Sequence, residues 1–176
     1  MKTLAARPSA DEHIEYYAKY IRLVPGDDLK HALESGAAAT RKLLEPVTDS
    51  QGMHRYATGK WSVKEVLGHV IDAERVFSYR ALRFGRGDQT PLPGFDENQY
   101  VPVAKSDLRP MDALRRELAA VRASTLALLD SFDEEALVRR GDANGDAISV
   151  RALLWIIAGH ELHHVGLLRE RYGLKG

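Results

Sequence analysis

Apolar residues recur every three or four positions in four long segments of the chain, a pattern typical of helices that bury one face. These segments begin near Asp28, Ser62, Arg109 and Ser149 and run to about residues 45, 85, 128 and 172. A shorter segment over residues 9–21 also predicts a helix, and no segment reads as a sheet. We therefore expect an all-α fold, namely a four-helix bundle with a short extra N-terminal helix.

All four long segments carry signals for a helix start, and Asp27 or Asp28 can cap the first. Ser62 and Glu65 form a Ser-x-x-Glu capping box, Pro110 suits a first helical turn, and Ser149 is a good N-cap. The loops over residues 48–60 and 85–105 are long for a bundle of this size. Long loops between rigid elements often carry function, so we expect one of them to border a site.

Composition narrows the class of protein. The 176 residues suffice for one core, and we expect a single domain over residues 1–176. The 25 basic and 25 acidic residues cancel, which argues against a nucleic-acid partner. No apolar run is long enough for a signal peptide or a membrane span, so we expect a cytoplasmic protein. The chain has no cysteine, so any thiol chemistry needs a thiol from a cosubstrate.

Two histidines in the last long segment indicate a metal site. His160 and His164 are four residues apart, and they share an apolar stripe with Ile156, Ile157 and Leu168. Buried imidazoles are costly unless their nitrogens are satisfied, and a divalent ion satisfies them well. The alternative is a pair of buried histidines that hydrogen-bond to neighbouring groups.

The same stretch, His160-Glu161-Leu162-His163-His164, also fits the H-E-x-x-H pattern of zinc peptidases, in which Glu161 would be the general base. Such sites need a third ligand further along the chain, but only 12 residues follow His164 and none is a histidine. The peptidase interpretation is therefore disfavoured. His163 is an alternative ligand to His164, which we favour.

The third ligand is expected upstream. His69 lies on an inward stripe of the second long segment with Val66, Ala73 and Val76. A single histidine in such a stripe is usually structural, but beside His160 and His164 it becomes a plausible third imidazole. Asp72 could accept a hydrogen bond from a ligand's second nitrogen or join the metal itself.

Three stretches carry a resemblance to a known family. They are Trp61–Arg80 (WSVKEVLGHVIDAERVFSYR), Pro93–Tyr100 (PGFDENQY) and Leu153–Arg171 (LLWIIAGHELHHVGLLRER). In this order and spacing they resemble the DinB-like superfamily over nearly the whole chain. The N-terminal pattern from Tyr17 to Asp27 is similar to the branch that contains bacillithiol transferases.

The resemblance implies an up-and-down four-helix bundle with one crossover-type connection, in which three histidines hold a divalent metal. Carried over position by position, these ligands fall on His69, His160 and His164. It also implies a homodimer, and for several branches a low-molecular-weight thiol as cosubstrate. Zinc, nickel, iron and manganese all accept imidazole, so the metal stays open.

Three functions are compatible with such a centre. The first is a metal-dependent S-transferase that uses a low-molecular-weight thiol, and the second is a metal-dependent hydrolase of a small ester or amide. The third is a non-catalytic metal-binding bundle. A hydrolase would need a general base, for which Asp72, Glu161 and the loop carboxylates Asp96 and Glu97 are candidates.

The remaining candidates concern substrate binding. The loop over residues 94–100 is the expected mouth of the site, and its Asp96 and Tyr100 are candidate substrate-binding residues. Arg80 could neutralise a carboxylate of a thiol cofactor. The expected partner is thus a small molecule, with neither nucleic acid nor membrane involved.

Overall fold

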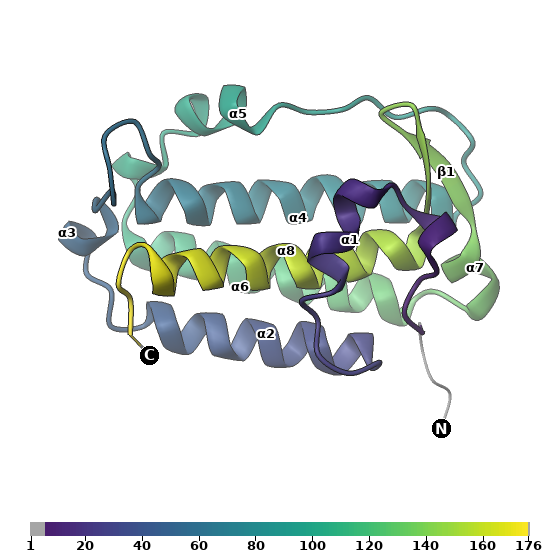
Figure 1. Ribbon diagram of the computed structural model, residues 1–176, viewed down its shortest axis with the longest axis horizontal. Helices are drawn as coiled ribbons and strands as arrows, with labels where there is room; N and C mark the ends of the chain where they lie inside the picture. The colour runs from purple at the N-terminus through teal and green to yellow at the C-terminus, as the bar shows by residue number, and fades with distance from the viewer. Residues whose placement is uncertain (1–5, 176) are drawn as a thin grey trace.

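Four long helices form the bundle in the computed structural model, which describes residues 6–175 (Figure 1). They are α2 (Leu29–Leu44), α4 (Val63–Gly85), α6 (Met111–Asp130) and α8 (Val150–Glu170). The predicted caps are present, because the side chains of Ser62 and Ser149 accept hydrogen bonds from the backbone N–H groups of Glu65 and Ala152. The all-α bundle is confirmed.

The connection after α4 determines the direction of the helices. Ser62, at the start of α4, donates a hydrogen bond to Asp107, just before α6, so these two helices run parallel. Tyr172, after α8, donates to the carbonyl of Trp61, so α8 is antiparallel to α4. The chain between Gly85 and Met111 therefore returns along the length of the bundle, as Figure 1 shows. This is the long crossover connection that the family resemblance implies.

Short elements fill the connections. The segment predicted as one helix over residues 9–21 divides into the 3-10 turn η1 (Ala10–Glu12) and the helix α1 (Glu15–Ile21). Helix α1 packs on α8. Four further short elements precede or follow α4 and α6: α3 (Asp49–Gly52), α5 (Glu97–Ala104), η2 (Ser106–Leu108) and α7 (Glu134–Val138).

A β-hairpin joins α7 to α8, so the expectation that no segment forms a sheet was wrong. Strands β1 (Arg140–Ala143) and β2 (Asp146–Ser149) pair antiparallel, with Arg140 opposite Ser149 and Ala143 opposite Asp146. The turn residues Asn144 and Gly145 have φ values of 62° and 86°. An Asn-Gly pair readily adopts this left-handed geometry and favours a tight hairpin. Leu92 of the crossover connection pairs with Ala143, which ties that connection to the hairpin.

The core fills the space between the four long helices. Helix α8 is central, because it packs against α1, α2 and α4, and its residues from Ala152 to Ala158 are all buried. Trp155, the largest of the fully buried side chains among the described residues, lies in this stretch. Within residues 6–175, no helix combines the length and the apolar character needed to cross a membrane.

Candidate metal centre

Helices α4 and α8 bring three histidines together. His69 lies in the first third of α4, whereas His160 lies at the middle of α8 and His164 one turn further on. All three are buried, with exposed fractions of 7–8%. The apolar residues that flank them along each helix anchor both helices in the core, and this fixes where the rings point.

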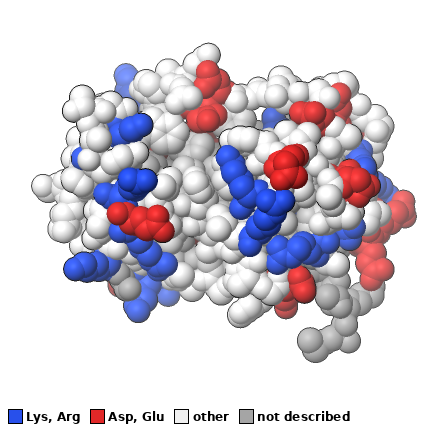
Figure 2. Space-filling model, in the orientation of Figure 1, with Lys and Arg blue, Asp and Glu red and all other residues white. Residues whose placement is uncertain are grey.

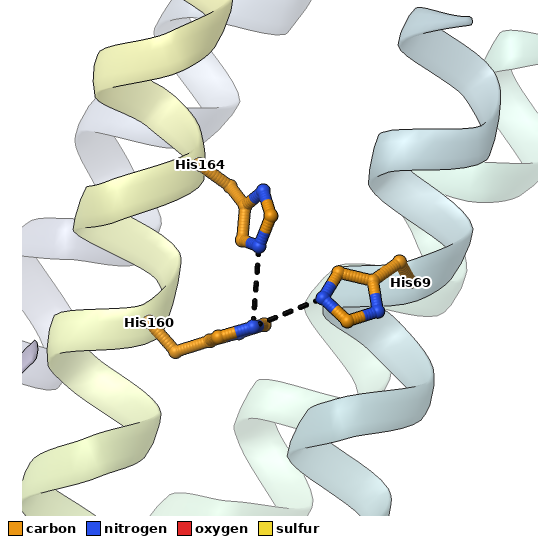
Figure 3. A group of neighbouring side chains, drawn as sticks. All are labelled: His69, His160 and His164. Carbon is orange, nitrogen blue, oxygen red and sulfur yellow. Dashed lines mark hydrogen bonds between the residues drawn. The ribbon is translucent and has the colours of Figure 1, made fainter. Parts of the chain in front are cut away.

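The ring nitrogens of these residues converge on one point, as Figure 3 shows. The Nε2 atom of His160 lies 3.0 Å from Nε2 of His69 and 3.2 Å from Nε2 of His164. One ligand atom from each of the three residues can be chosen within 4.8 Å of the other two. The structure therefore brings together the three residues that the sequence singled out.

Burial keeps these imidazoles neutral. It lowers the pKa of His69 to about 4 and the pKa of His160 to about 3, and it lowers the pKa of His164 as well. The neighbouring rings add to the effect, because a second positive charge beside the first is disfavoured. Neutral rings leave lone pairs free at neutral pH, which is the form that binds metal ions.

The geometry fits a divalent ion. Nitrogens at ~2.1 Å from a tetrahedral ion lie roughly 3.4 Å apart, close to the two distances found here. A neutral imidazole carries one proton, so the Nε2 atom of His160 cannot donate to both of the nitrogens it faces. An ion accepts all three lone pairs at once. The buried Nδ1 atom of His164 has no hydrogen-bond partner among the described residues, so the internal contacts leave this ring incompletely satisfied.

The three histidines line a cavity of about 420 Å³. Helix α1 covers one side of it, and the ring of Tyr20 lies 5.4 Å from that of His160. Phe95 and Glu97 of the crossover connection also line the cavity. Both belong to the loop over residues 94–100, which we expected at the mouth of the site. The other lining residues come from α1, α4, α8, the hairpin and the loops: Tyr16, Tyr17, Lys19, Trp61, Ala73, Phe77, Arg80, Gly94, Asn144 and His163.

Two candidate catalytic residues lie away from this cavity. Asp72 borders a separate hollow with Gln99 and Tyr100, and burial raises the pKa of its carboxyl group. Glu161 lies on a different face of α8, where it accepts a hydrogen bond of 2.8 Å from Arg122. The carboxylate that does line the cavity among the described residues is Glu97.

Of the three candidate substrate-binding residues, Arg80 lines the cavity, whereas Asp96 and Tyr100 do not. Arg80 is buried and lines the cavity. Asp96 is the N-cap of α5, where it accepts hydrogen bonds from the backbone of Asn98 and the side chain of Gln99. Tyr100 is about half exposed and packs on Phe95 outside the cavity. His163 lines the cavity but lies outside the group of three converging histidines.

Helix α1 and the hairpin contribute residues that the sequence pattern did not single out. Tyr16, Tyr17 and Tyr20 form an aromatic wall, and Lys19 lies over the ring of Tyr16 at 3.8 Å. Asn144 reaches the cavity from the hairpin turn. The three tyrosines within five residues and the Asn-Gly pair were the available signals for these two walls.

The chain matches the model of a known protein family over most of its length. Residues 32–168 match the model of the DinB superfamily, which is more than half of the chain. The protein belongs to the DinB superfamily. The match confirms the family resemblance from which His69, His160 and His164 were carried over as expected ligands.

Two relatives of this DinB-superfamily protein carry functional names. "Putative metal-dependent hydrolase YfiT" of Bacillus subtilis (strain 168) is 25% identical over 142 residues, covering 78% of this chain and 79% of that protein. "Putative metal-dependent hydrolase GK0616" of Geobacillus kaustophilus (strain HTA426) is 27% identical over 139 residues, covering 76% and 78%.

Solved structures share the fold. The structure of YfiT, described as having an unusual four-helix bundle topology, aligns with a TM-score of 0.71 at 21% identity, covering 98% of this chain and 99% of that one. A mycothiol-dependent maleylpyruvate isomerase aligns with a TM-score of 0.63 at 18% identity, covering 85% of this chain and 59% of that one.

Proposed function

We propose that His69, His160 and His164 bind one divalent metal ion and that the protein is a metal-dependent enzyme acting on a small molecule. The observation that carries this proposal is the convergence of three buried, neutral imidazoles on the wall of a cavity. The names of the two relatives support the metal. A non-catalytic ion would need no cavity beside it.

The reaction that we favour is the transfer of a low-molecular-weight thiol to a small electrophile. A divalent ion lowers the pKa of a thiol or water that it binds, so that a nucleophile forms at neutral pH. In the transfer, the thiol sulfur forms a bond to carbon, the leaving group departs with its electron pair, and the thiol proton passes to solvent. The chain contributes no cysteine that could compete with the cosubstrate.

The walls of the cavity suit such a reaction. Tyr20 and Phe77 lie edge-on to His160, at 5.4 and 6.3 Å between ring centroids. Trp61 packs against His69 at 5.0 Å. These rings pack against the histidines and leave them little exposed, while the remaining space of about 420 Å³ admits an organic ligand.

Hydrolysis of a small ester or amide is the second candidate, and the names of YfiT and GK0616 favour it. In that reaction Glu97 is the residue we would assign as general base, since it is the described carboxylate that lines the cavity. Asp72 and Glu161 have no part in either proposal, because their carboxylates lie outside the cavity.

One assay separates the two reactions. Metal-loaded protein is offered monochlorobimane with bacillithiol, mycothiol or glutathione, and separately p-nitrophenyl acetate without thiol. We expect conjugation with at least one thiol, and we expect the His160→Ala variant to lose it. Ester turnover without thiol that depends on Glu97 would replace the transferase by the hydrolase, and the absence of both activities would contradict the enzyme proposal.

A further inference from the structure

Two arginines in this protein are equally buried, but only one is neutralised. Arg80 and Arg122 each have an exposed fraction of 3%. Arg122 donates to both carboxylate oxygens of Glu74 at 2.9 Å and to Glu161 at 2.8 Å. Among residues 6–175, no carboxylate forms an ion pair with Arg80. Burying a charge without a counter-charge costs free energy, so the burial of Arg80 without an ion pair has to be explained.

The described partners of Arg80 are all neutral. Its guanidinium donates a hydrogen bond of 2.7 Å to the carbonyl of Pro93, interacts with the hydroxyl of Tyr17, and lies 5.9 Å from the centre of the Phe77 ring. These contacts from α1, α4 and the crossover connection fix the side chain in one place. They orient the positive charge without cancelling it.

Arg80 shares the cavity with the three histidines. It lies eleven residues after His69 on α4, which is about three helical turns, so both residues are on the same face. The small residue Ala73 and the ring of Phe77 lie between them on the cavity wall. Phe77 lies 6.3 Å from the ring of His160 and 5.9 Å from the guanidinium of Arg80, so a ligand that reaches both would lie beside this ring.

The charge around the cavity is positive. Lys19 adds a second cation at the wall formed by α1, and Glu97 is the acidic residue of the described lining. On the face shown in Figure 2, by contrast, acidic and basic side chains are interspersed. The two cations of the cavity lining outnumber its one described carboxylate.

We propose that Arg80 forms an anion-binding subsite and that the ligand of this cavity carries a carboxylate, bound at Arg80 while its reactive group lies at the histidines. The second half of this statement rests on the proposed function. A planar guanidinium pairs well with a carboxylate, and the single negative charge of a carboxylate matches the one buried cation. A doubly charged phosphate would exceed the single buried charge of Arg80, because Lys19, the other cation of the described lining, is exposed to solvent.

The test compares pairs of ligands that differ only in charge. On zinc-loaded protein, 4-mercaptobutanoate is compared with 4-mercaptobutanamide and 3-mercaptopropylphosphonate by calorimetry. On metal-free protein, 4-phenylbutanoate is compared with 4-phenylbutanamide, so that this arm does not depend on the metal. The variants are Arg80→Met, which removes the charge, and Arg80→Lys, which keeps it without the planar fork. Arg83→Met is the matched control, since Arg83 lies on the same helix outside the cavity and pairs with Asp88.

We expect each carboxylate to bind at least about tenfold more tightly than its amide in the wild type and in Arg83→Met. The preference should vanish in Arg80→Met and shrink in Arg80→Lys. If Arg80→Met does not fold, the wild type and Arg80→Lys still decide the matter.

Equal binding of carboxylate and amide by the wild type would overturn the subsite, as would a preference that survives in Arg80→Met. Tighter binding of the phosphonate would overturn the ligand class. If neither mercaptan binds the zinc-loaded protein but 4-phenylbutanoate is preferred through Arg80, the subsite stands and the thiol transferase fails.

Discussion

Helices α4 and α8 carry two buried polar clusters on different faces, and the two are satisfied in opposite ways. One cluster is the ionic network of Glu74, Arg122 and Glu161. Arg122 also donates a hydrogen bond of 2.8 Å to the carbonyl of Leu33. The other is the group of three histidines with Arg80 on the cavity wall. The members of the network all have partners, whereas among the described residues the Nδ1 atom of His164 has no hydrogen-bond partner and Arg80 has no carboxylate partner.

The difference separates stability from function. A network whose members all have partners fixes the packing of helices, and it needs nothing from outside. A cluster with convergent lone pairs and an uncompensated charge is stabilised by a bound ion or ligand. The adjacent residues His160 and Glu161 belong to different clusters, so a shift of one position along α8 separates the two roles.

The largest expected effect is on the ionic network. Replacing Arg122 by Met leaves two buried carboxylates without a counter-charge, so the free energy of unfolding should fall by about 3–5 kcal/mol in a urea titration. The control is Arg116→Met, which removes an exposed ion pair with Asp112 and should cost less than about 0.5 kcal/mol. Equal losses in the two variants would contradict the distinction between buried and exposed pairs.

The cover of the cavity is tested at Gly159. A Cβ atom at this position of α8 would lie 2.0 Å from the backbone oxygen of Tyr20. Gly159→Ala should therefore displace α1 and lower the free energy of unfolding by about 3 kcal/mol. The matched control is Gly166→Ala on the same helix, where the added methyl meets nothing within 4 Å and should be neutral or stabilising by up to about 1 kcal/mol. A tolerated Gly159→Ala would show that α1 is not held closely against α8.

The attachment of the segment before α1 should depend on pH. Burial alone would raise the pKa of Glu12 above its usual value of 4.5, but hydrogen bonds from Arg151 and Ser9 lower this pKa to about 2. The stabilisation by Glu12 is therefore complete above pH 4.5 and is lost as the pH falls from about 4.5 to 2.

Glu12→Gln measures this contribution. The variant should be less stable than the wild type by about 2 kcal/mol at pH 7, and the difference should disappear near pH 2. Chemical denaturation at several pH values provides the measurement. A difference that does not change with pH would mean that packing of Glu12, rather than its charge, anchors the segment.

The smallest effect is expected at Asp72. Its side chain is 33% exposed, lies 3.9 Å from Arg75, and borders a hollow other than the histidine cavity. Asp72→Asn should therefore change the affinity for zinc by less than about twofold, since neither the ligands nor their partners are altered. A tenfold loss, measured by competition with a chelator, would place Asp72 in the metal site.

The long helices are present as predicted, and two of the three candidate ligands could be paired from sequence, because both features depend on local patterns. The capping residues Ser62 and Ser149 and the spacing of His160 and His164 are readable along one helix. That His69 would meet them follows from packing between helices, for which the family resemblance supplied the link.

Other features could not be read from local pattern. The partners of Glu161 and Arg80 come from distant segments, so their opposite surroundings became visible only in the structure. Helix α1 places its tyrosines on the wall of the cavity because it packs on α8. The sequence of α1 alone does not specify that position. The hairpin at residues 140–149 had a readable Asn-Gly signal that the helix pattern overshadowed. The expected homodimer, the single domain over the whole chain and the cytoplasmic location stay predictions.

The most direct test of the central claim is the metal content of the purified protein after exposure to zinc, nickel, iron or manganese and removal of loosely bound ions. We expect one ion per chain in the wild type and in His163→Ala, and none in His69→Ala, His160→Ala or His164→Ala, with each variant shown to be folded by circular dichroism. A wild-type protein that retains no ion, or a folded His160→Ala variant that retains as much as the wild type, would contradict it.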